Sequence, residues 1–102
     1  MKVEVFYFEG CPNQQPAVER VQSVMKEQGI DATLAEVEVP DAEAAKAVGF
    51  LGSPTIRVNG LDIDPASRAA TETGLACRCY AGGIPSEDMI RAALREAQGQ
   101  AR

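Results

Sequence analysis

Apolar and polar residues recur with two different periods along the first part of the chain. Residues 3–8 are almost entirely apolar, so both faces of this segment are expected to be covered, as in a central strand. Residues 12–28 place apolar side chains at every third or fourth position, which predicts a helix that ends before Gly29. Residues 30–39 alternate with period two until Pro40, a pattern typical of a half-exposed outer strand.

Shorter elements are predicted in the second part. Asp41 is a good N-cap for an alanine-rich helix that ends near Val48, before a glycine able to adopt the left-handed conformation. Residues 55–59 and 61–64 predict an antiparallel hairpin around an Asn-Gly turn. Ser86 is the expected N-cap of the last helix. These elements predict one α/β domain over residues 1–102, with a four-stranded mixed sheet and helices on both faces.

Composition indicates which kinds of partner and which cellular compartment to expect. The chain has 102 residues and a net charge of −5, which argues against a nucleic acid or an anionic membrane surface as the main partner. It has no apolar run long enough to span a membrane and no signal-like start, so the cytoplasm is the expected location. In a reducing cytosol, three cysteines point to reactive or metal-binding thiols before structural disulfides. The oligomeric state stays open.

The candidate chemistry begins at Cys11, where a predicted strand gives way to a predicted helix. Backbone N–H groups and the helix dipole favour a thiolate at such a position, and they need no histidine, which this chain lacks. Cys77 and Cys79 lie in a long connection at about residues 65–85, a length that is often functional. The predicted hairpin returns the chain to the sheet end that carries Cys11, so this loop can fold over that thiol.

The order of elements, together with Cys11-Pro12 and Ser53-Pro54-Thr55, resembles the thioredoxin and glutaredoxin superfamily. The resemblance implies a thioredoxin-like fold with Pro54 in the cis conformation beside Cys11. It also implies that Pro12 and the Ser53-Pro54-Thr55 segment contact the substrate.

One position departs from the dithiol members of that superfamily. Gln14 stands where they have their second cysteine, so any partner thiol must come from elsewhere in the chain. More narrowly, residues 10–13, 52–55 and 77–79 are similar to small bacterial thioredoxin-like proteins labelled alkylmercury lyase-like, some of which carry selenocysteine at the position of Cys11. That likeness adds soft-metal chemistry to the possibilities.

In the main hypothesis the protein is a thiol-disulfide oxidoreductase or a thiol peroxidase-like protein. Cys11 attacks a disulfide or peroxide substrate, and Cys77 or Cys79 resolves the intermediate. The substrate is a protein or a low-molecular-weight thiol or disulfide, and no cofactor is expected. Arg78, between the loop thiols, could favour the thiolate of either and contact substrate, although the plainer expectation is a surface residue without a fixed partner.

Two alternatives remain at this stage. Cys11, Cys77 and Cys79 could instead bind a soft ion such as Hg(II), and organomercurial cleavage would then need an acid. Asp62 and Asp64 are the candidates for that acid, although both are expected to be solvated strand-end carboxylates. The third possibility is a noncatalytic interaction domain in which the cysteines are structural.

Overall fold

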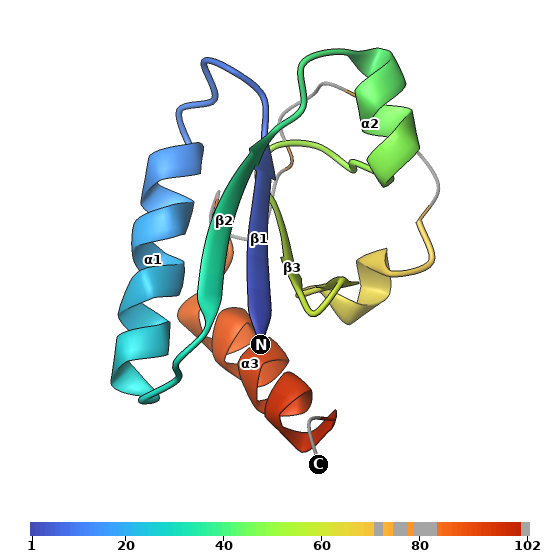
Figure 1. Cartoon of the computed structure of the whole chain (residues 1–102). Coiled ribbons are helices and arrows are strands. Elements are labelled where there is room, and N and C mark those ends of the chain that lie inside the picture. The colour runs from blue at the N-terminus through green and yellow to red at the C-terminus, as the bar shows by residue number, and fades with distance from the viewer. Residues whose placement is uncertain (71–72, 75–77, 79–83, 101–102) are drawn as a thin grey trace.

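The computed structural model describes residues 1–70, 73–74, 78 and 84–100 (Figure 1). Its elements follow the predicted order, with one additional short 3-10 helix. None of the described helices has the length and apolar character needed to cross a membrane. The elements are β1 (Lys2–Tyr7), α1 (Gln14–Glu27), β2 (Thr33–Glu38), α2 (Ala42–Val48), β3 (Thr55–Val58), β4 (Leu61–Asp62), η1 (Pro65–Ser67) and α3 (Glu87–Gln100).

The four strands form one mixed sheet in the order β2-β1-β3-β4. β1 pairs in parallel with β2 and antiparallel with β3, and β3 pairs antiparallel with β4. The central position of β1 and the outer position of β2 confirm the sequence predictions. Phe6 on β1 lies opposite Thr55 on β3, so the end of β1 that leads to Cys11 is also the end at which β3 begins.

The core has two parts because the sheet is covered on both faces. Val3 and Val5 of β1 pack with the buried sides of α1 and α3, which lie next to each other in Figure 1. Phe6 faces the other way and packs with Ala45 of α2 and Phe50. This alternation on β1 explains its nearly continuous apolar sequence, and it confirms the predicted α/β architecture with helices on both faces.

The predicted helix caps and hairpin turn are also confirmed. The Asp41 carboxylate accepts a hydrogen bond from the Ala44 N–H group at 2.8 Å, and Ser86 Oγ accepts one from Met89 N–H at 3.1 Å. At the hairpin turn, Asn59 has φ 51°. Its neighbour Gly60 is also in the positive-φ region, as an Asn-Gly turn of this kind requires.

The start of α1 differs from the prediction. We expected the helix to begin at Pro12, but it begins at Gln14 with Asn13 as the N-cap. The reason is a preceding turn, in which the Gln14 N–H group donates to the carbonyl oxygen of Cys11 at 3.4 Å. Cys11 therefore lies in the turn that leads into α1, two residues before its N-cap.

Candidate functional site

Cys11 is a free thiol in the connection between β1 and α1. Its backbone N–H group donates to the carbonyl oxygen of Phe8 at 3.3 Å, which closes a turn directly after β1. Gly10 has φ 89°, a conformation that a side chain would strain, and so allows the chain to reverse there. Only 8% of Cys11 is exposed.

The Ser53-Pro54 peptide bond is cis, as the superfamily resemblance implied. The residues on either side of Pro54 are fully buried. Thr55 Oγ1 donates to the carbonyl oxygen of Gly52 at 2.5 Å, whereas Ser53 Oγ has no hydrogen-bond partner within the part of the chain that the structure describes. Pro54 is fully buried as well, so none of the three side chains of this turn is exposed to an approaching molecule.

Arg78 forms a buried ion pair with Asp62 of β4. Its two terminal nitrogens donate to the two carboxylate oxygens at 2.7 and 3.0 Å, and the side chains of Arg78 and Asp62 are only 10% and 5% exposed. A further hydrogen bond from Arg78 reaches Ser67 Oγ at 3.0 Å. The expectations that Arg78 lacks a fixed partner and that Asp62 is solvated are therefore wrong, because each side chain supplies the other's counter-charge away from water.

The backbone of Arg78 is attached to the cis-proline turn. Its N–H group donates to the carbonyl oxygen of Ser53 at 2.9 Å. Earlier in the same connection, Gly74 N–H donates to the carbonyl oxygen of Phe50 at 3.2 Å. Gly74 and Arg78 are thus held along the segment that precedes β3. Cys77 and Cys79, the two predicted partner thiols, lie outside the described residues.

Asp64 has a structural use that the sequence did not indicate. Its carboxylate accepts hydrogen bonds from Ala66 N–H and Ser67 Oγ, both at 3.1 Å, and so caps η1. The carboxylate of Asp62 also accepts a bond from Asp64 N–H at 2.9 Å, in addition to its pair with Arg78. These hydrogen bonds count against either carboxyl group as the acid in carbon–mercury cleavage.

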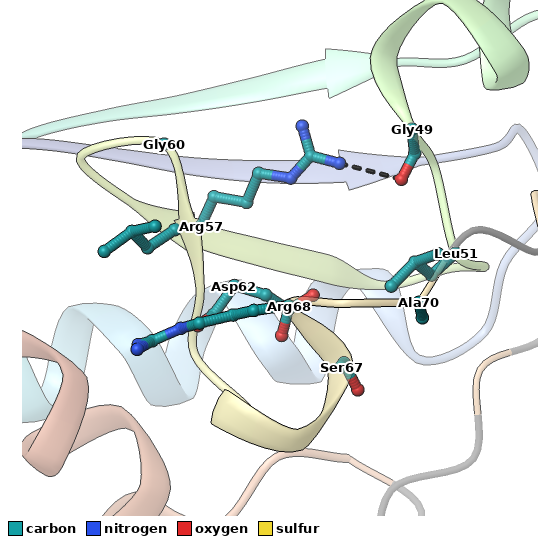
Figure 2. Close-up of a pocket in the computed structure, with 9 residues that line it drawn as sticks. Gly49, Leu51, Arg57, Gly60, Asp62, Ser67, Arg68 and Ala70 are labelled. Carbon is teal, nitrogen blue, oxygen red and sulfur yellow. Dashed lines mark hydrogen bonds between the residues drawn. The ribbon is translucent and has the colours of Figure 1, made fainter.

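A pocket of about 220 Å³ lies between the β3–β4 hairpin and η1, and Asp62 of this ion pair is among its lining residues (Figure 2). Arg57 crosses it to donate to the Gly49 carbonyl oxygen at 2.8 Å. Arg68 extends away from it, donating to the Asp62 carbonyl oxygen and to both carboxylate oxygens of Glu96. Because both arginines are used within the protein, we assign no anion site here.

The pairing of Arg68 with Glu96 shifts the pKa of both groups. The hydrogen bond from Arg68, assisted by its charge, holds the pKa of Glu96 below its ordinary value. The same hydrogen bond is the main cause of a raised pKa at Arg68. The pair connects the chain just after η1 to α3.

Sequence reasoning missed Asp62 and Ser67 as the residues that position Arg78. An acidic residue late in a strand and an arginine in a loop are common, and nothing in their spacing indicates that they meet. No group of three or more cysteine or carboxylate side chains arranged to hold a metal ion occurs among the described residues. That finding does not include Cys77 and Cys79.

Comparison with known proteins identifies one family. A family model described as a domain of unknown function, DUF2703, matches residues 12–93, which is most of the chain. The chain belongs to this family. No curated protein and no solved structure matches it significantly. The matched span includes the cis-proline turn, both residues of the buried ion pair and the two loop cysteines, and it begins one residue after Cys11.

Proposed function

We propose that this member of the DUF2703 family is a thiol-based redox protein in which Cys11 is the nucleophile and Cys77 or Cys79 is the resolving thiol. The observation that carries the proposal is the attachment of Arg78 to Ser53, next to the cis-proline turn and at the sheet end that leads to Cys11. Arg78 is the residue between the two loop cysteines. The ion pair with Asp62 supports a fixed position for that residue.

Covalent geometry links this attachment to the two thiols. Cys77 and Cys79 are the immediate sequence neighbours of Arg78, and one residue of chain spans at most about 3.8 Å. Holding Arg78 therefore limits how far either thiol can travel from the cis-proline turn. A resolving thiol kept within a short distance of its target reacts faster, because less entropy is lost when the two sulfurs meet.

The proposed reaction proceeds in two thiol–disulfide exchanges. The Cys11 thiolate attacks one sulfur of a substrate disulfide, which forms a mixed disulfide and releases the first substrate thiolate. A thiolate at Cys77 or Cys79 then attacks the Cys11 sulfur, forms an intramolecular disulfide and releases the second substrate thiolate. The substrate gains two electrons and the protein loses two.

The other predicted substrate contacts differ in their exposure. Pro12 is exposed, and we retain it as a substrate contact. Ser53, Pro54 and Thr55 are fully buried, so their side chains shape the turn rather than meet the substrate directly. Arg78 acts as a positioning residue, because its guanidinium group is already bound to Asp62 and Ser67.

The decisive experiment follows the reduced protein by mass spectrometry during reaction with a neutral low-molecular-weight disulfide. The wild type should end with an intramolecular disulfide. Cys11→Ser should form no disulfide at the site, and the double variant Cys77→Ser/Cys79→Ser should stop at the mixed disulfide on Cys11. The proposal fails if Cys11 in the wild type reacts with an alkylating agent no faster than a free model thiol at the same pH.

Soft-metal binding is the second candidate, and the same attachment of Arg78 supports it, because three thiolates near one point would suit Hg(II) or Cu(I). Native mass spectrometry with Hg(II) should then detect one retained ion that is lost in Cys11→Ser and Cys79→Ser. The hydrogen bonds already made by Asp62 and Asp64 favour binding over carbon–mercury cleavage. A noncatalytic interaction domain predicts instead that the three single Cys→Ser variants leave cellular function intact.

We further propose that the protein works in the reducing cytoplasm, where a partner reductase or a low-molecular-weight thiol can return it to the dithiol form.

A further inference from the structure

A second pocket adjoins the turn that holds Cys11. It has a volume of about 290 Å³ and is lined by residues from the end of β1 and the end of β2. Phe8, one of those residues, accepts the hydrogen bond from Cys11 N–H through its carbonyl oxygen, so the part of the lining made by Phe8 and Glu9 belongs to the same turn as the thiol. The lining residues are Phe8, Glu9, Glu38, Val39 and Pro40.

The pocket combines an apolar base with an acidic rim. Phe8 and the buried Val39 supply apolar surface, while Glu9 and Glu38 supply exposed carboxylate side chains. Its described lining contains no lysine or arginine. Concave surfaces that carry one sign of charge concentrate ligands of the opposite sign and repel those of the same sign.

The size of the pocket suits a small group. Pockets for drug-sized ligands span roughly 300–1,000 Å³, and this one lies just below that range. A short alkyl arm that ends in an ammonium group would cover the apolar base and bring its charge to the two carboxylates. The carboxylate arms that many biological thiols carry would be repelled by these two glutamates.

We propose that this pocket selects disulfides whose arm next to the sulfur is cationic, and that it discriminates against anionic disulfides. This inference rests on the proposed function, because the pocket acts by holding the arm of a substrate that reacts at Cys11. Glu9 and Glu38 bind the cation and take no part in bond making.

The test compares three symmetrical disulfides of similar size: cystamine, bis(2-hydroxyethyl) disulfide and 3,3′-dithiodipropionate. Each rate of reaction with the reduced protein is divided by the rate with 2-mercaptoethanol, which removes the intrinsic reactivity of the disulfide. Cystamine should then exceed dithiodipropionate by about tenfold at low ionic strength, and the ratio should fall towards one in molar salt.

Variants assign the selectivity to the pocket. Glu38→Gln and Glu9→Gln should each lower the ratio several-fold, and the rate with the neutral disulfide should change little. Asp31→Asn is the matched control, since it makes the same change of charge at an exposed position just before β2, at the opposite end of the sheet from Cys11. It should leave the ratio unchanged.

The same measurements distinguish a failure of the proposed pocket from a failure of the proposed redox function. Similar normalised rates for the three disulfides, or an equal effect of Asp31→Asn and Glu38→Gln, would overturn the pocket's role and leave the redox function intact. No acceleration over 2-mercaptoethanol with any of the three disulfides would overturn the redox function, and with it this inference.

Discussion

Arg78 and Asp62 bind each other through two hydrogen bonds of 2.7 and 3.0 Å, with little of either side chain exposed. The pair joins a loop residue to the fourth strand across 16 positions of sequence. Since Arg78 also bonds Ser53 through its backbone, the ion pair helps to hold Arg78 against the turn that contains the cis-proline. The consequences of removing it are measurable in several ways.

Breaking the pair by a single substitution should destabilise the protein strongly. We expect Asp62→Asn or Arg78→Met to lower the free energy of unfolding by about 3–5 kcal/mol, because the remaining partner is left as a buried, unpaired charge or polar group. Chemical denaturation followed by circular dichroism measures this change. Asp31→Asn, exposed and remote from the pair, should cost less than about 0.5 kcal/mol.

The double variant Asp62→Leu/Arg78→Met should be much more stable than either single variant. Replacing both charges by apolar groups of similar size removes the desolvation penalty together with the attraction, and such changes are often nearly neutral. A double variant as unstable as the sum of the two single variants would show that the pair does not act as a unit.

The kinetic role of the pair differs from its role in stability. Under the proposed function, Asp62→Asn should slow the resolving step by about 10- to 100-fold, because Cys77 and Cys79 would no longer be held near Cys11. The first attack by Cys11 should keep its rate. Rapid quenching with acid and mass spectrometry would then detect accumulated mixed disulfide. A loss of the first step at the same time would instead indicate a general disturbance of the fold.

The pair of Arg68 and Glu96 predicts a pH dependence of stability. The hydrogen bond from Arg68 lowers the pKa of Glu96 in the folded protein below its ordinary value of 4.5. The folded state therefore binds this proton less readily than the unfolded state, so the contribution is fully present above pH 4.5. It is lost as the pH falls from there through the lowered value. Glu96→Gln should remove this part of the acid dependence.

Thermal unfolding measured from pH 7 to pH 3 would check this prediction. Glu19→Gln is the control, because Glu19 is an exposed carboxylate on α1. The stability of the Glu96→Gln variant should fall less steeply on acidification than that of the wild type. The Glu19→Gln curve should follow the wild-type curve, and equal slopes for all three proteins would contradict the assigned pairing.

Gly49 ends α2 in the left-handed conformation, with φ 67°. A Cβ atom at this position would have room, since its nearest neighbour would be Arg57 Nη2 at 3.5 Å. The cost of Gly49→Ala should therefore come from the backbone conformation alone and amount to about 1 kcal/mol in unfolding free energy. Gly49→Asn should cost less, because asparagine tolerates this conformation. Equal losses in the two variants would point to a steric cause.

The sequence by itself determined most of the local structure. The apolar run of residues 3–8 predicted the central strand, because a strand covered on both faces needs apolar side chains on both. Asp41 and Ser86 were recognised as helix caps, since a short polar side chain before a helix satisfies its first free N–H groups. The α/β architecture then followed from the order of the elements. The cis bond at Pro54 came from the superfamily resemblance and not from the pattern of residues.

Only the tertiary structure decided how the candidate site is assembled. The pairing of Arg78 with Asp62 depends on the approach of a loop to a strand end, and no local period encodes such a contact. The start of α1 at Gln14 follows a backbone turn in which the Gln14 N–H group donates to the carbonyl oxygen of Cys11. The sequence predicted a solvated carboxylate at Asp62, but the folded chain buries it. A charge removed from water requires a counter-charge nearby, and Arg78 supplies it.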